Sequence, residues 1–412
     1  MRPLIPILLA ALLGQATFAL ELQPLDLPTQ GSSLAPGLTA LDDGRILLSW
    51  LEVTESGHRL RLADFDGDRF GEAMTIVEGD GFFANWADTP AIHVGGDGRW
   101  LVHWLQRSGQ GTYAYDVVMA ISTDEGAHWS SPFSPHRDGT LTEHGFVSSF
   151  RDHSGALHAV WLDGRETQPA AVDQGHSGHD SHGHGAMTLR TARIDGLGEL
   201  SHEALLDERV CDCCATASAM TDAGPVVVYR DRSEDEIRDI FITRRLEGEW
   251  TEPEAVHADG WQIAACPVNG PGVLGRDQTV VVAWFTMADN EPRVRLAFSS
   301  DAGEHFAAPQ TLDAGTALGR VDLSWVEDGV LLSWLTETAS GSTLRLARFD
   351  LDGRLAGQWD LLSLDGGRVS GFPRLQALGE GRVLLAWTEG GRRGSRVRAG
   401  WLTLPEPAAE SP

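Results

Sequence analysis

Positive charge is scarce in this chain. It has 32 lysine and arginine residues against 59 aspartate and glutamate residues, a formal net charge of −27. Proteins bind nucleic acid and anionic membranes through lysine and arginine side chains that neutralise phosphates, so this composition argues against both as partners. An acidic surface favours cations instead, although net charge alone more often concerns solubility.

Long apolar runs are absent beyond the first residues. Residues 4–13 are apolar, Arg2 precedes them, and the small residues around Ala16 and Ala19 follow. This order is typical of a secretory signal peptide over residues 1–19, and the run is too short to span a bilayer. The residue directly after the predicted cleavage point is Leu20 and not a cysteine. We therefore expect an exported protein, periplasmic or extracellular, without a membrane span or lipid anchor.

Helical periodicity is also lacking. Instead, a turn, a short apolar run and a final aromatic residue recur seven times, ending at Trp50, Trp104, Trp161, Tyr229, Trp284, Trp334 and Trp387. Short strands repeated about every 50 residues indicate a β-propeller. We predict an all-β propeller of four-stranded blades over residues 20–404, seven by this count or six if one copy is irregular, followed by a tail at 405–412. Residues 22–27 are expected to supply the missing strand of the last blade and close the ring.

Two turns share a motif, Ser-x-Asp-x-Gly-x-x-Trp/Phe. Its residues are Ser122, Asp124, Gly126 and Trp129 in one turn, and Ser299, Asp301, Gly303 and Phe306 in the other. The chain therefore resembles the Asp-box (bacterial neuraminidase repeat) propellers of the sialidase-like superfamily. In such a turn the serine and aspartate bond backbone amides and the aromatic residue packs beneath. We expect both turns between the third and fourth strands of a blade, away from any site. Propellers of this superfamily usually have six blades, so seven would be a departure.

The catalytic set of sialidases is not recognisable. Those enzymes hold the substrate carboxylate with three arginines, and use a Tyr–Glu pair as nucleophile and an aspartate as acid. The Arg-Ile-Pro motif of their first innermost strand is missing from residues 35–39 here. Only Tyr113, Tyr115 and Tyr229 are available as nucleophiles, and sequence assigns none of them a glutamate partner. Enzymatic activity therefore stays an open question at this point.

Cysteine is rare and unevenly placed. Cys211, Cys213 and Cys214 lie within four residues, and the fourth cysteine is Cys266. The two segments precede the innermost strands of the fourth and fifth blades, so we expect them to meet beside the mouth of the central channel. Thiolate ligands select soft ions, copper(I) first and zinc second. The alternatives are structural disulfides that tie two blades, Cys211–Cys266 or Cys214–Cys266, or a redox-active thiol pair.

An insertion in the third blade is rich in histidine. It contains His176, His179, His182, His184 and Met187, and its spacing by glycine and serine predicts a metal-binding loop. We place it between the second and third strands, on the face of the cysteines; the alternative is a polar loop without function. Polar side chains predicted around the same mouth are Asn85, Asp88, His144, Arg230, Asn269, Arg320 and Arg368. The charged loop 230–239 could belong to an active site or be a self-compensating set of ion pairs.

The leading hypothesis is an exported, monomeric propeller whose cysteines and loop histidines bind copper at the channel mouth. Two alternatives stay open. One is a glycan-acting hydrolase of sialidase-like type, and the other is a non-catalytic binding scaffold with an interblade disulfide. The expected ligand is accordingly a metal ion, a small molecule or a glycan.

Overall fold

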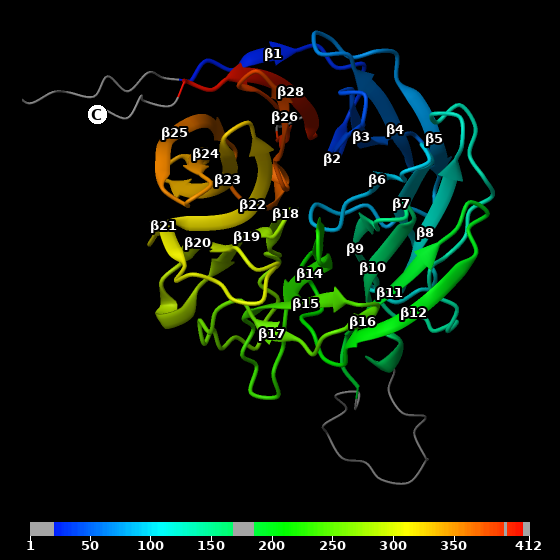
Figure 1. Ribbon diagram of the computed structural model, residues 1–412. Helices are drawn as coiled ribbons and strands as arrows, with labels where there is room; N and C mark the ends of the chain where they lie inside the picture. The colour runs from blue at the N-terminus through cyan, green and yellow to red at the C-terminus, as the bar shows by residue number, and fades with distance from the viewer. Residues whose placement is uncertain (1–19, 168–184, 391–393, 407–412) are drawn as a thin grey trace, which may run out of the picture.

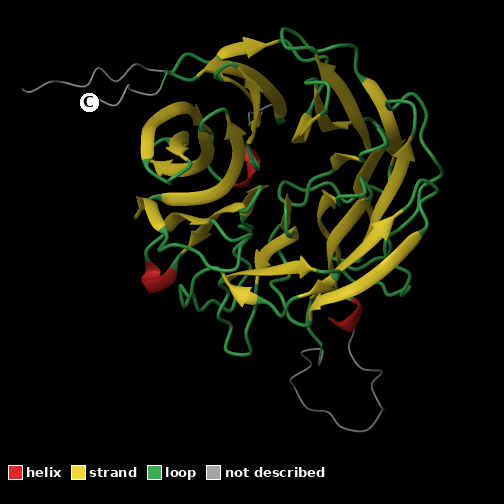
Figure 2. Cartoon of the chain, viewed as in Figure 1, coloured by secondary structure: helices red, strands yellow, loops and turns green. Residues whose placement is uncertain are grey.

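The computed structural model describes residues 20–167, 185–390 and 394–406, in which almost all regular structure is β-strand (Figure 2). The strands form seven sheets around a central channel (Figure 1). The prediction of an all-β propeller with seven blades is thus confirmed. The predicted signal peptide, the four loop histidines and residues 407–412 lie outside the described residues.

Each blade begins with its innermost strand and runs outward. The first three blades contain β2 (Ser33–Ala40), β3 (Ile46–Val53), β4 (His58–Phe65) and β5 (Met74–Gly79); β6 (Ala91–Val94), β7 (Trp100–Arg107) and β8 (Tyr115–Ser122); and β9 (His144–Arg151), β10 (Leu157–Asp163), β11 (Thr188–Ile194) and β12 (Leu200–Asp207). The next two contain β13 (Ala217–Thr221), β14 (Gly224–Arg230), β15 (Ile240–Leu246), β16 (Glu249–Trp250) and β17 (Glu254–Ala255); and β18 (Gly272–Arg276), β19 (Thr279–Thr286), β20 (Arg293–Ser299) and β21 (Gln310–Ala314). The last two contain β22 (Ala317–Val326), β23 (Gly329–Thr338), β24 (Gly341–Asp350) and β25 (Leu355–Leu364); and β26 (Arg374–Gly379), β27 (Arg382–Glu389), β28 (Arg396–Thr403) and β1 (Gln23–Leu25). Three short 3-10 helices are η1 (Arg165–Thr167), η2 (Ala288–Asn290) and η3 (Arg368–Ser370).

The short apolar run of the seven-fold sequence repeat forms the second strand of every blade. This strand is covered on both faces by neighbouring blades, so its residues are apolar throughout rather than alternating. The aromatic residue near its end is a buried tryptophan in six blades and Tyr229 in the fourth, and a buried indole N–H needs a partner. Trp161 donates to Asp163 two residues later at 2.8 Å, whereas Trp334 donates to Asp313 of the preceding blade at 3.0 Å. These bonds fix the second strands to their surroundings.

The second blade is the irregular one. Its sheet has the three strands β6, β7 and β8, and a single bridge between Met119 and Phe133 stands where a fourth strand would pair. The count of seven is unaffected, because this sheet still occupies its own place in the ring (Figure 1).

The two ends of the chain close the ring. β1 pairs antiparallel with β28, with Gln23 opposite Trp401 and Leu25 opposite Ala399. In Figure 1 the blue N-terminal strand lies along the red C-terminal strand. The predicted closing strand at residues 22–27 is therefore confirmed.

The two Ser-x-Asp-x-Gly turns have matching geometry. Ser122 Oγ donates to Asp124 at 2.9 Å and accepts the Gly126 N–H at 2.8 Å, and Ser299 bonds Asp301 and Gly303 in the same way. The turns follow β8 and β20, the third strands of their blades. The aromatic residues at their ends, Trp129 and Phe306, pack against apolar clusters. Both turns thus lie at the opposite ends of the third strands from the loops that surround the channel mouth.

Within the part of the chain that is described, none of the helices has the length and apolarity needed to cross a membrane.

We expect the closing strand to stabilise the whole ring. A chain that begins at Pro28 should be less stable than one that begins at Leu20 by roughly 3 kcal/mol or more, because the leucines of residues 20–27 leave the clusters they pack against. Urea unfolding followed by tryptophan fluorescence measures the difference. Equal midpoints for the two chains would contradict a closing role for β1.

Candidate metal centre at the channel mouth

A cavity of about 840 Å³ opens at one face of the propeller. Its walls come from the loops that lead into innermost strands and from the loops between second and third strands. The chemically active side chains along it are Asn85, Tyr115, Glu143, Met187, Asp212, Cys213, Arg232, Cys266 and Arg368. The turns that contain Asp124 and Asp301 contribute nothing to it. A second cavity, of about 450 Å³, lies among the innermost strands themselves.

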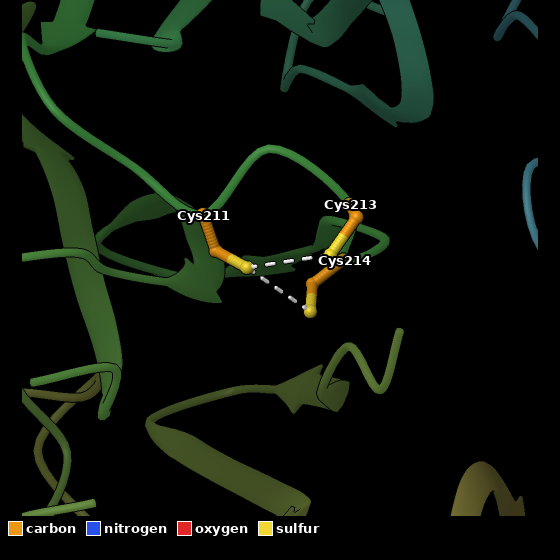
Figure 3. A group of neighbouring side chains, drawn as sticks. All are labelled: Cys211, Cys213 and Cys214. Atoms are coloured by element: carbon orange, nitrogen blue, oxygen red, sulfur yellow. Dashed lines mark hydrogen bonds between the residues drawn. The ribbon is translucent and has the colours of Figure 1, made fainter. Parts of the chain in front are cut away.

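Three cysteine sulfurs converge at the wall of the mouth cavity. Cys211 Sγ lies 3.4 Å from Cys214 Sγ and 3.8 Å from Cys213 Sγ (Figure 3). All three sulfurs are within 4.8 Å of one another. Cys211 and Cys214 are buried, while Cys213 is partly exposed and lines the cavity.

The turn that carries these cysteines is tied to both neighbouring segments. The N–H of Cys211 donates to the Arg230 carbonyl at 3.0 Å, which continues the bridge between Val210 and Asp231. The Asn269 N–H donates to Cys214 Sγ at 3.4 Å. The turn is therefore held from its own blade and from the segment that leads into the next one.

Positive charge lies beside the sulfurs. The Arg238 guanidinium donates to Cys211 Sγ at 3.2 Å. Hydrogen bonding with the neighbouring Cys213 and Cys214 thiols, together with the nearby Arg230 charge, lowers the pKa of Cys211 well below its usual value. Burial raises the pKa of Cys214 to about 12, and the neighbouring thiols raise that of Cys213. The guanidinium of Arg238 thus favours negative charge at Cys211, the sulfur that is nearest to both other thiols.

Cys266 approaches from the next blade, as the repeat spacing predicts. Its thiol is exposed and lines the same cavity, and the neighbouring Cys213 thiol lowers the pKa of Cys266. All four cysteines lie in described parts of the chain and all are free thiols. The structure therefore contains neither of the interblade disulfides, Cys211–Cys266 and Cys214–Cys266, considered from the sequence.

Two of the predicted mouth residues, Arg230 and Arg320, face the protein interior. The Arg230 guanidinium donates to the carbonyls of Arg238, Asn269 and Phe285 at 2.6–3.1 Å. Arg320 donates to the carbonyls of Gly367 and Gly371 and to Ser370 Oγ at 2.7–3.0 Å. Both arginines are buried, and their guanidiniums donate hydrogen bonds to irregular backbone between blades. They are unavailable to a ligand in the cavity.

Asn269 and Asn85 also organise backbone. Asn269 Oδ1 accepts the N–H of Arg320 at 2.8 Å, and its amide donates to the Leu318 carbonyl at 3.2 Å. Asn85 Oδ1 accepts the N–H groups of Ala87 and Asp88 at 2.8 and 2.7 Å, although this residue does line the cavity.

Asp88 and Arg368 lie on different sides of the mouth. Asp88 is buried among the innermost strands, where it accepts the Phe146 N–H at 2.8 Å and burial raises its pKa to about 8. Arg368, at the start of η3, is exposed, lines the cavity and lies 5.8 Å from the Trp86 ring centre. Of the two, only Arg368 is placed to contact a ligand in the mouth cavity.

His144 was expected at the mouth, but its neighbour Glu143 takes that place. His144 is fully buried, stacks on His136 with ring centres 3.7 Å apart, and faces Asp116, Asp138 and Asp163. Burial disfavours its charged form, but the Asp116 and Asp163 carboxylates outweigh this and raise the pKa of His144 to about 9.

Met187 belongs to the core rather than to an exposed capture loop. It directly precedes β11, is 2% exposed and packs with Leu189, Val210 and Tyr229. Its apolar side chain also reaches the cavity wall. The prediction of a mobile methionine ligand over the cysteines is therefore not met at this position.

Three residues of the loop 230–239 form internal ion pairs. Glu236 bonds Arg232 at 2.7 Å and Arg238 at 2.8 Å, and Arg232 also reaches Asp212 at 3.3 Å. The self-compensating interpretation holds for these residues. Arg232 and Asp212 still line the cavity.

A Tyr–Glu pair that sequence reasoning missed lines the same cavity. Tyr115 Oη donates to Glu143 Oε1 at 2.6 Å, and the tyrosine ring stacks on Phe83. Burial raises the pKa of Glu143 to about 7, and burial with the Asp88 charge raises that of Tyr115 well above its usual value. The sequence did contain a signal for this contact. Tyr115 begins the third strand of one blade and Glu143 precedes the innermost strand of the next, so the repeat places both at the mouth face of neighbouring blades.

Comparisons with known proteins identify the fold alone. No protein-family model and no curated protein sequence matches the chain. A solved protein of unknown function from Dyadobacter fermentans is 14% identical, with 93% of this chain and 98% of that chain covered and a TM-score of 0.53. The α-L-arabinofuranosidase Arb93A from Fusarium graminearum is 12% identical, with 95% and 99% covered and a TM-score of 0.51. The polysaccharide lyase Uly1 is 10% identical, with 90% of each chain covered and a TM-score of 0.50.

We expect Arg230 to be essential for stability. Arg230→Met should lower the free energy of unfolding by roughly 3 kcal/mol or more, because three buried carbonyls lose their donors. Arg230→Lys should be less severe, since an ammonium keeps the charge but lacks the planar fork. Urea unfolding checks both.

The matched control is Arg69→Met, an arginine whose side chain is 86% exposed; it should change stability by no more than about 0.5 kcal/mol. A loss in Arg230→Met no larger than in this control would show that the carbonyl contacts are dispensable.

Proposed function

We propose that the protein is an exported propeller that binds one soft metal ion, copper(I) in preference to zinc, at the cysteine cluster of the channel mouth. The observation that carries the proposal is the convergence of Cys211, Cys213 and Cys214, with sulfurs within 4.8 Å of one another. Copper(I) accepts two or three thiolates, and soft sulfur ligands favour it over harder ions.

The surroundings of the cluster support binding. Arg238 beside Cys211 compensates the negative charge of a thiolate. Cys266 adds a fourth sulfur from the adjacent blade, next to Cys213. Because Cys213 and Cys266 line the open cavity, an ion can enter from solvent while Cys211 and Cys214 hold it from the buried side. The loop histidines His176, His179, His182 and His184 belong to the proposal as capture ligands, by sequence alone.

We expect the reduced protein to hold one tightly bound copper(I) per chain in competition with a chromophoric copper(I) chelator. The double variant Cys211→Ser, Cys214→Ser should lose this equivalent, because it removes the two buried sulfurs. Elemental analysis after gel filtration gives the stoichiometry, and circular dichroism confirms that the variant is folded.

A variant with serine at His176, His179, His182 and His184 is the control for the cysteines. It should keep the tight equivalent and load more slowly. Equal copper content in the wild type and the cysteine variant, or loss in the histidine variant alone, would contradict a thiolate site.

The Tyr115–Glu143 pair favours a second candidate, glycoside hydrolysis in the same cavity. The resemblance to sialidase-like propellers implies such a pair as the nucleophile, with the glutamate accepting the phenolic proton. The pair is at hydrogen-bonding distance, and Arg368, Arg232 and Asp212 share the cavity. An arginine and a carboxylate are therefore near the point at which a sugar would bind.

If this candidate is right, the protein should hydrolyse at least one fluorogenic glycoside in a panel that includes sialosides. Tyr115→Phe should then abolish turnover, since the nucleophilic oxygen is gone. Tyr113→Phe is the matched control, because Tyr113 lines the same cavity, is 63% exposed and should leave the rate within about twofold. Equal activity of the two variants would exclude Tyr115 as nucleophile.

A further inference from the structure

Two of the four cysteines line the mouth cavity, and the other two lie behind its wall. Cys213 is partly exposed, Cys266 is exposed, and both belong to the cavity wall. Cys211 and Cys214 are 1% and 2% exposed and are not part of that wall. A solute that enters the cavity therefore meets Cys213 and Cys266 first. This access matters because exposed cysteines react, whereas buried structural cysteines are inert.

The segments that contain Cys213 and Cys266 lie against each other. Val268 packs against the same apolar cluster as Cys213. The backbone of Gly270 is so close to that of Ala215 that a side chain at position 270 would collide with it. Within this contact the Cys213 thiol is the neighbour of the Cys266 thiol. The two accessible thiols thus lie next to each other across the boundary between the fourth and fifth blades.

The buried pair is closer together but is held by protein donors. Cys211 Sγ and Cys214 Sγ are 3.4 Å apart. The Arg238 guanidinium donates to Cys211 Sγ at 3.2 Å, and the Asn269 N–H donates to Cys214 Sγ at 3.4 Å. Exchange with an external disulfide requires that one sulfur can reach it. The buried pair lacks this access, so the exposed pair is the one that can react.

The mouth cavity is large enough to admit a small disulfide. Its volume of about 840 Å³ is within the range of pockets that hold small-molecule ligands. Arg232 and Arg368 line it together with the two thiols. Positive charge beside a partly exposed thiol favours the thiolate, which is the form that attacks a disulfide.

We propose that Cys213 and Cys266 are a reversible redox pair, which a small-molecule disulfide entering the mouth cavity converts into an interblade disulfide. The Cys266 thiolate displaces one thiolate from the incoming disulfide and forms a mixed disulfide. Cys213 then loses its proton and attacks Cys266 Sγ, and the second thiolate leaves. Two cysteine thiols thereby give up two electrons and two protons, and the incoming disulfide takes them up and is released as two thiols.

Oxidation of this pair also affects the metal site, an effect that rests on the proposed function. The Cys213–Cys266 bond removes the two sulfurs on the solvent side of the cluster. Cys211 and Cys214 stay reduced, but they lie behind the wall, where an ion from solvent no longer reaches them. Oxidation therefore closes the copper site, and a thiol reductant opens it again.

Oxidised glutathione tests the redox pair in the reduced, metal-free, full-length chain. Peptide mapping after an acid quench should show one disulfide, Cys213–Cys266, with Cys211 and Cys214 left as thiols. A small thiol reductant should restore all four thiols. Cys213→Ser should stop the reaction at one glutathione on Cys266, because the resolving thiol is absent.

Cys214→Ser is the matched control, because it removes a buried sulfur of the same turn and should still form the Cys213–Cys266 disulfide. Circular dichroism confirms that the variants are folded, and the mapping of the wild type needs no variant. A Cys211–Cys214 disulfide in the wild type, or four thiols left unreacted, overturns the proposal. A Cys266→Ser variant that reacts with glutathione as fast as the wild type overturns it as well.

The effect on copper is measured separately on the oxidised and the reduced chain. The oxidised chain should take up no tightly bound copper(I), and reduction should restore one equivalent. Equal copper binding by the two forms overturns the closing of the site. A reduced chain that binds no copper(I) refutes the proposed function instead, and the mapped disulfide then decides the redox pair by itself.

Discussion

The guanidinium of Arg230 holds together the two segments on which the channel mouth depends. It binds the carbonyls of Arg238, whose side chain reaches Cys211, and of Asn269, whose N–H reaches Cys214. The Arg230 carbonyl itself accepts the N–H of Cys211. Backbone carbonyls in irregular segments must find donors when they are buried, and the planar fork of one arginine supplies several. The cysteine turn is therefore positioned by packing between two blades, before any ligand binds.

Strand alternation divides the chemistry at the boundary of the second and third blades. Tyr115 and Glu143 face the mouth cavity, and the next residues, Asp116 and His144, face the opposite side. Successive side chains of a strand point to opposite faces. The same two strand beginnings thus present one polar pair to the mouth cavity and another to a buried histidine cluster.

Much of this arrangement could be predicted from sequence, because the repeat determines which loops share a face. The count of seven, the closing strand and the meeting of the turn 211–214 with the segment of Cys266 all follow from that register. Side-chain direction does not follow. Arg230, Arg320 and Arg368 were all predicted at the mouth, yet the first two bind interior carbonyls and only the third is exposed. His144 was placed at the mouth in error because a shift of one residue exchanges the two faces. The histidine cluster was missed because His136 lies in an irregular segment without a repeat position.

The pairing of β1 with β28 makes the last blade a product of both ends of the chain. Its outermost strand is made first and its partner is made last, so this contact has nearly the greatest sequence separation that the propeller allows. Such contacts form late, because closing a long loop costs conformational entropy before the strand pairing can stabilise the structure. The first six blades can form one after another as the chain is synthesised, whereas the seventh must wait for its end. Until then the outer edge of β27 and the N-terminal strand both lack their partner β28, and unpaired edges are the state in which a β-rich chain is most exposed to wrong pairing.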